Sequence, residues 1–173
     1  PEVIEAIRTY GETPVLAAGG IVTVRQMAAC MAMGAAGAWT GSVWLTTAEA
    51  ETSPAVRDKL LRASSRDTVR SRSRTGKPSR QLRSTWTDAW DSGSSPDPLP
   101  MPLQSLVSEP ALRKIDKLSQ SGHEGARELA TYWVGQGVGL MNQESSVRNV
   151  MQEFQEDFLA ACERLQIVTG VEV

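Results

Sequence analysis

The sequence has few of the residues that most often carry catalysis, metal binding or membrane insertion. Its 173 residues include one histidine and two cysteines, and no apolar run approaches the roughly 20 residues that a membrane-spanning helix needs. The two cysteines, Cys30 and Cys162, form neither a disulfide framework nor a metal-ligand spacing. We interpret both as buried small hydrophobic residues. No metal site is expected, and a cytoplasmic protein is the working expectation.

An excess of positive charge is also missing, because the formal net charge is −2, which argues against bulk binding of nucleic acid. The charges are nevertheless unevenly spread. Ten of the 18 basic residues fall between Arg57 and Arg83, where the only acids are Asp58 and Asp67. This run is either a nucleic-acid contact surface or a solvated excursion that pairs with acids elsewhere in the fold. We favour the excursion, because a basic run alone is weak evidence and this one contains no aromatic residue that could stack on bases, the next being Trp86 and Trp90.

The first third of the chain has the pattern of a parallel α/β sheet. An amphipathic helix is predicted over residues 2–10, and a short apolar strand, buried on both faces, over residues 15–18. Thr23 is a candidate N-cap for a helix over residues 24–33. Residues 38–42 end the next strand, with the apolar run continuing to Leu45, and a further helix is expected over residues 54–62. Strand, helix and strand in this order predict a βαβ unit.

The remainder is predicted to be mainly helical. Residues 91–102 are rich in proline, serine and glycine and predict a loop. Helices are expected near residues 109–118, 124–133 and 145–165, and the last of these has apolar residues at three- and four-residue spacing. A glycine-rich break over residues 135–139 separates the last two helices.

Glycines lie at the ends of both predicted strands. Gly19 and Gly20 follow the first strand, and Gly41 follows the second between Thr40 and Ser42. Glycines let an anion approach backbone N–H groups, and the following helix N-terminus favours negative charge. Two such strand ends, one βα unit apart, match the phosphate site formed by the last two strands of many (β/α)₈ barrels. The alternative is a pair of tight turns without a ligand.

The residues around these glycines resemble the nitronate monooxygenase family, formerly called 2-nitropropane dioxygenases. The similarity is carried by residues 14–21 (PVLAAGGI), 33–42 (MGAAGAWTGS) and 45–49, and more loosely by 75–83 (TGKPSRQLR) and 133–139 (WVGQGVG). Residues 91–120 are unmatched. IMP dehydrogenases and flavin-dependent enoyl reductases share the barrel motif, and the later patches favour nitronate monooxygenases over them.

The resemblance implies the α/β class, as the C-terminal part of a (β/α)₈ (TIM) barrel with a mainly helical extension. It implies an FMN-dependent oxidoreductase that oxidises alkyl nitronates with O₂ to a carbonyl compound and nitrite. Expected domains are the last βα units with the phosphate site (1–50), a basic and Pro/Ser-rich excursion over the substrate (51–122) and returning helices (123–173). The implied FMN-binding residues are Gly19, Gly20, Trp39, Thr40, Gly41, Ser42 and Gln136.

No catalytic residue is assigned within the chain. The family's catalytic histidine lies in a Gly-His-x-Gly-Gly segment that would precede Pro1, and we interpret His123 as an exposed residue at a helix start. A complete barrel takes about 250 residues, so we expect a fragment that shows little turnover alone. Two alternatives remain open. One is another FMN barrel oxidoreductase, such as an enoyl reductase, and the other is a non-catalytic interaction fragment that uses its basic segment.

Overall fold

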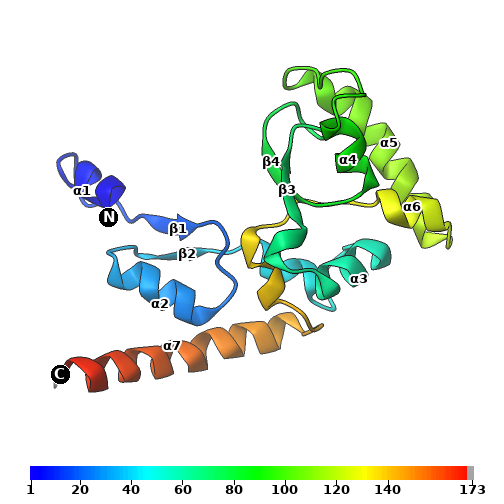
Figure 1. Ribbon diagram of the computed structural model, residues 1–173. Helices are drawn as coiled ribbons and strands as arrows, with labels where there is room; N and C mark the ends of the chain where they lie inside the picture. Colours follow the sequence, from blue (N-terminus) through cyan, green and yellow to red (C-terminus); the bar gives the residue numbers. More distant parts are fainter. Residues whose placement is uncertain (171–173) are drawn as a thin grey trace.

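The computed structural model describes residues 1–170 and opens with the predicted βαβ unit (Figure 1). Helix α1 (Glu2–Arg8) precedes strand β1 (Leu16–Ala18), helix α2 (Val24–Ala32) and strand β2 (Gly37–Trp39). The strands pair in parallel, with Leu16 opposite Gly37 and Ala18 opposite Trp39. The chain is therefore an α/β protein, as predicted, and both strands end at the same edge of the sheet.

Local capping fixes where α2 begins. The Thr23 hydroxyl accepts from the Gln26 backbone N–H at 3.4 Å, and the Gln26 side chain accepts from the Thr23 backbone N–H at 2.9 Å. This reciprocal arrangement satisfies N–H groups that have no partner inside the first turn of a helix. The predicted N-cap is confirmed. The amide of Gln26 also donates to the Gly20 carbonyl at 3.2 Å, which ties the helix start to the loop after β1.

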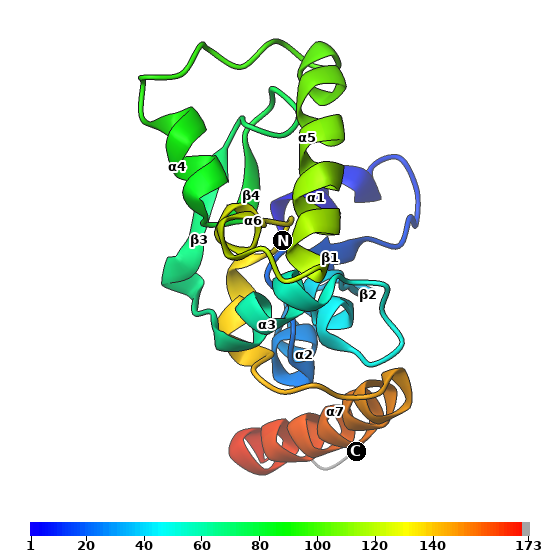
Figure 2. The same ribbon diagram turned by 90° about the vertical axis from the view of Figure 1, so that its right-hand side faces the viewer.

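A second group of elements, here called the hairpin–helix unit (residues 65–129), follows a 3₁₀ helix η1 (Ser42–Thr46) and helix α3 (Pro54–Arg62). It stands on the other side of η1 and α3 from the βαβ unit (Figures 1 and 2). Its elements are the 3₁₀ turn η2 (Ser65–Asp67), the antiparallel strands β3 (Thr68–Ser71) and β4 (Ser79–Leu82), and the helices α4 (Thr85–Asp91), α5 (Leu103–Gln120) and α6 (Glu124–Leu129).

The chain then returns to the βαβ unit. A 3₁₀ helix η3 (Gln136–Leu140) leads to the long helix α7 (Val147–Thr169), which packs along α2 at the bottom of Figure 2. The buried or half-buried residues of α7 include Val150, Phe154, Phe158 and Cys162, at the predicted spacing. Cys162 and Cys30 of α2 are free thiols, and both are half-buried rather than buried as predicted. None of the helices within residues 1–170 combines the length and apolar character needed to cross a membrane.

The hydrophobic core lies between the βαβ unit and the hairpin–helix unit. Its central residues Leu60 and Val138 are fully buried, and they come from α3 and η3. Burial of such side chains is the main favourable term in folding, so their packing holds η3 against α3. The cluster is formed by Val22, Val43, Val56, Leu60, Ala63, Leu82, Ala130, Val134, Val138, Met141 and Val150.

Several predictions of local structure are wrong. The first strand is not buried on both faces, since Leu16 is 50% exposed and β1 pairs only with β2 within residues 1–170. Residues 43–45 do not extend the second strand but turn into η1. The helix predicted over residues 124–133 ends at Leu129, because the segment that follows it pairs with β4. The helix predicted near residues 109–118 begins earlier, at Leu103, and contains Pro110.

Candidate functional site

Three glycine-bearing segments meet at the carboxyl edge of the parallel strands. The Gly135 N–H donates to the Ser42 hydroxyl at 2.8 Å. This bond joins the residue directly before η3 to the first residue of η1. A Cβ atom on Gly135 would lie 3.3 Å from the Gly20 nitrogen, and one on Gly137 would lie 2.7 Å from the Gly20 carbonyl oxygen. The approach of Gly137 requires glycine, because an added Cβ atom would overlap a backbone atom of Gly20. We call Gly19, Gly20, Gly41, Ser42, Gly135 and Gly137 together the glycine cradle.

The backbone of the cradle is shaped for close contact with another group. Gly19 and Gly20 adopt φ angles of +105° and +70°, a region that residues with a Cβ atom rarely occupy. An added Cβ atom would meet nothing within 4 Å at Gly19 or at Gly41. The space beside these two glycines is therefore open, while the space beside Gly135 and Gly137 is filled by the Gly20 backbone.

Two hydroxyl groups flank Gly41 along the chain. The Thr40 hydroxyl accepts from the Trp44 indole N–H at 3.0 Å, and the Thr40 carbonyl accepts from the same N–H at 3.2 Å. The Ser42 hydroxyl accepts from Gly135, as described above. Within residues 1–170, neither hydroxyl hydrogen has an acceptor of its own. A hydroxyl can donate and accept at once, so both can donate to an anion.

The structure brings the seven residues predicted from the sequence to one region, with different exposure. Gly19 and Gly20 follow β1, while Thr40, Gly41 and Ser42 follow β2 directly. The Trp39 side chain is 71% exposed, so it is the backbone at this position that belongs to the strand end. Gln136 is exposed and begins η3 between the two cradle glycines Gly135 and Gly137.

Sequence reasoning missed the direct partners of Gly20. It named Gln136 from the glycine-rich break but left Gly135 and Gly137 unassigned, although these two glycines make the contact. The signal was present as glycines spaced by one residue within the string GQGVG. Their partner could not be identified from the sequence, because more than 90 residues separate Ser42 from Gly135 and only the fold brings them together.

The only histidine is a capping residue. His123 is exposed, and its Nδ1 accepts from the Ala126 backbone N–H at 3.2 Å, at the start of α6. This confirms its interpretation as a histidine at a helix start. No group of three or more histidine, cysteine, aspartate or glutamate side chains within residues 1–170 is arranged to hold a metal ion.

The basic run folds as most of α3, the turn η2 and the β3–β4 hairpin, and not all of its arginine side chains are exposed to solvent as predicted. Arg74 is only 6% exposed and pairs with Glu109 of α5 at 3.4 Å. Arg80 donates to the Thr68 hydroxyl at 2.9 Å, and Arg72 donates to the Gly76 carbonyl at 3.0 Å. The expected pairing with a distant acid is therefore found at Arg74, while the expectation of a solvated side chain is wrong there.

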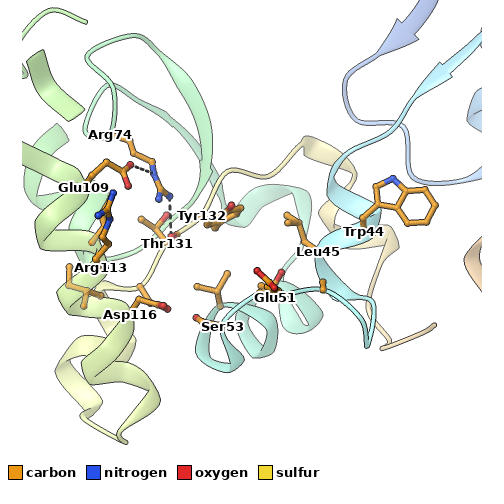
Figure 3. Close-up of a pocket in the computed structure, with 16 residues that line it drawn as sticks. Trp44, Leu45, Glu51, Ser53, Arg74, Glu109, Arg113, Asp116, Thr131 and Tyr132 are labelled. Carbon is orange, nitrogen blue, oxygen red and sulfur yellow. Dashed lines mark hydrogen bonds and ion pairs between the residues drawn. The ribbon is translucent and has the colours of Figure 1, made fainter. Parts of the chain in front are cut away.

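A cleft of about 500 Å³ lies between the hairpin–helix unit and the rest of the chain (Figure 3). Trp44 and Leu45 of η1 form part of one wall, and Glu109, Arg113 and Asp116 of α5 face them. This volume suits a small organic molecule, for which pockets of about 300–1,000 Å³ are usual. None of the seven predicted site residues lines the cleft, but η1, which begins at the cradle, connects the two.

The fold defines an α/β protein whose parallel βαβ unit carries glycines at both strand ends. More specifically, the chain belongs to the nitronate monooxygenase family, because the model of that family matches residues 1–157. It is 58% identical over 167 residues, or 96% of its length, to Rv1533 of Mycobacterium tuberculosis, whose name assigns it to the monooxygenases. It is 30% identical over 145 residues, or 83% of its length, to a Bacillus subtilis protein named as a nitronate monooxygenase.

Solved structures show the same relationship. A nitroalkane oxidase from Streptomyces ansochromogenes covers 95% of this chain with a TM-score of 0.77 and 25% identity. FabK from Thermotoga maritima covers 94% with a TM-score of 0.71 and 28% identity. The chain spans 40% to 50% of the length of these four proteins.

Proposed function

We propose that the chain is part of an FMN-dependent oxidoreductase barrel in which the glycine cradle holds the FMN phosphate. The observation that carries the proposal is the open space beside Gly19 and Gly41, together with the close packing of Gly135 and Gly137 against the Gly20 backbone. A phosphate needs unobstructed backbone N–H groups, and this edge offers them at two neighbouring strand ends. Membership of the nitronate monooxygenase family supports the choice of FMN.

The residues present fit a phosphate group. Gly19, Gly20 and Gly41 would let it approach the backbone, and the Ser42 and Thr40 hydroxyls would donate to its oxygens. The Trp39 backbone would lie at the same strand end, and Gln136 would lie nearer the flavin ring. No acidic residue belongs to the cradle, so charge repulsion does not oppose an anion there.

The proposed reaction is oxidation of an alkyl nitronate by O₂ to a carbonyl compound and nitrite. FMN, when bound, supplies the redox chemistry, while the protein supplies binding and orientation. The partners are therefore a small nitronate-like substrate and O₂. We assign no catalytic base to residues 1–170, and the role of these residues is to anchor the cofactor.

Gly41→Ala tests the cradle without disturbing the fold. Gly41 has φ −130°, outside the left-handed region that favours glycine, and its new methyl group would enter space with no protein atom within 4 Å. We expect the free energy of unfolding to stay unchanged while FMN affinity falls about 10-fold or more, since one charge-assisted hydrogen bond accounts for such a change. The measurement is titration of the natural protein with FMN, followed by flavin fluorescence.

Gly125→Ala is the matched control, because Gly125 lies in α6, and its added methyl group would meet only the His123 ring, at 3.4 Å. It should bind FMN like the wild type. If the wild type binds no FMN, the proposed function is wrong. If Gly41→Ala binds as tightly as the wild type, the phosphate does not lie in the cradle. Nitronate-dependent O₂ uptake by the FMN-loaded natural protein then tests the reaction itself.

A further inference from the structure

Arg74, in the turn between β3 and β4, is a buried cation with partners on three sides. Its Nε donates to a Glu109 carboxylate oxygen at 3.4 Å, and its Nη1 donates to the Thr131 carbonyl at 3.5 Å (Figure 3). Its guanidinium carbon lies 4.0 Å from the centre of the Trp133 ring and 5.1 Å from that of the Tyr132 ring. A buried charge is costly unless it is paired, so an arginine with this many partners has a defined place in the fold.

Three of these partners are consecutive residues of what we call the return segment (residues 131–134). This segment runs antiparallel beside β4 and forms an isolated β-bridge between Trp133 and Gln81. The Leu82 N–H donates to the Tyr132 carbonyl at 2.9 Å, and the Val134 N–H donates to the Arg80 carbonyl at 3.3 Å. The Thr131 hydroxyl donates to the Leu82 carbonyl. Backbone hydrogen bonds to β4 hold one edge of the return segment. The Arg74 guanidinium lies over the Tyr132 and Trp133 rings of the same segment.

The return segment leads directly into the glycine cradle. Trp133, on which Arg74 stacks, is two residues before Gly135, whose N–H is bound by the Ser42 hydroxyl. Gly137 then approaches the Gly20 carbonyl so closely that no Cβ atom would fit. A small displacement of the return segment would therefore move the side of the cradle that closes on Gly20.

We propose that Arg74 is a positioning residue for cofactor binding, which holds the return segment so that Gly135 and Gly137 close the cradle on Gly20. The planar guanidinium suits this task, because it stacks on an aromatic ring while its N–H groups bind in its own plane. The Glu109 contact fixes Arg74 to α5, so one side chain joins the hairpin, helix α5 and the return segment. The part that concerns the cofactor rests on the proposed function.

The test uses Arg74→Met, Arg74→Lys and the control Arg70→Met in the natural protein. Arg70 lies on β3, and its exposed side chain makes no hydrogen bond or ion pair within residues 1–170. The first readout is hydrogen exchange of backbone amides, and the second is FMN affinity. We expect Arg74→Met to speed exchange at Gly135 and Val134 about 10-fold or more, as local opening becomes easier. Exchange in α2 should stay as in the wild type.

FMN affinity of Arg74→Met should fall about 10-fold, Arg74→Lys should fall between it and the wild type, and Arg70→Met should match the wild type. Unchanged exchange over residues 131–137 in Arg74→Met would overturn the positioning role, as would exchange that rises equally in α2. If Arg74→Met fails to fold, Trp133→Leu removes the other half of the stack and must show the same local change. A wild type that binds no FMN, with local exchange still dependent on Arg74, would remove the proposed function and retain the positioning role.

Discussion

The turn between β3 and β4 gives a prediction whose magnitude follows from the structure. Gly76 has φ +82°, and a Cβ atom there would lie 2.1 Å from the Leu99 carbonyl oxygen and 2.9 Å from the Met101 nitrogen. Both are backbone atoms of the segment that leads into α5, so neither can rotate away. Gly76→Ala must therefore adopt a strained backbone and also displace residues 99–101.

The two effects can be separated and estimated. A left-handed backbone costs a residue with a Cβ atom about 1–2 kcal/mol, and overpacking costs about 1–3 kcal/mol. We expect Gly76→Ala to lower the free energy of unfolding by about 2–5 kcal/mol, the sum of both terms. Gly93→Ala is the matched control, because Gly93 has φ +74° but nothing within 4 Å of its added Cβ atom. It should lose only the backbone term.

Urea unfolding of the natural protein, followed by tryptophan fluorescence, measures both losses. Trp86 and Trp90 report on this region, since their rings lie 5.9 Å apart in α4, which packs against β3. The midpoint should fall further for Gly76→Ala than for Gly93→Ala at an unchanged denaturant slope. Equal losses for the two variants would show that residues 99–101 do not pack against the turn at Gly76, which would refute this reasoning.

Two further predictions concern α2 and α3. Thr23→Ala removes the capping box of α2 and should lower the free energy of unfolding by about 1 kcal/mol in the same assay, and no loss would mean that Gln26 alone holds the helix start. Lys59 donates to the carbonyls of Glu128 and Ala130 at 3.0 and 2.8 Å. Burial lowers the pKa of Lys59 below 10.5, and the negative charge of the Glu128 carboxylate opposes this shift. Between the lowered pKa and 10.5 the unfolded chain binds more protons, so stability attributable to Lys59 rises with pH in that window. The difference in unfolding free energy between wild type and Lys59→Met should therefore grow as the pH rises toward 10.5, and a difference that shrinks would contradict the assignment.

The elements that the sequence determined are those set by interactions within a few residues. Thr23 and Gln26 are three residues apart, and together they start α2 where the pattern predicts. Helix α3 has the predicted bounds, with Pro54 at its first turn, and α7 follows the predicted apolar spacing. The glycines at both strand ends were also visible, because parallel pairing of neighbouring strands places their ends at one edge.

Only the tertiary structure decided how distant segments complete these elements. Leu129 ends α6 because the next residues pair with β4, about 50 positions earlier, and helix propensity contains no information on that pairing. The contact of Gly137 with Gly20 and the burial of Arg74 between Glu109 and Trp133 likewise join segments far apart in the chain. A residue's type states what it can bind, whereas the fold decides which partner reaches it. The composition of the basic run therefore predicted a solvated side chain at Arg74, whereas the folded chain buries it.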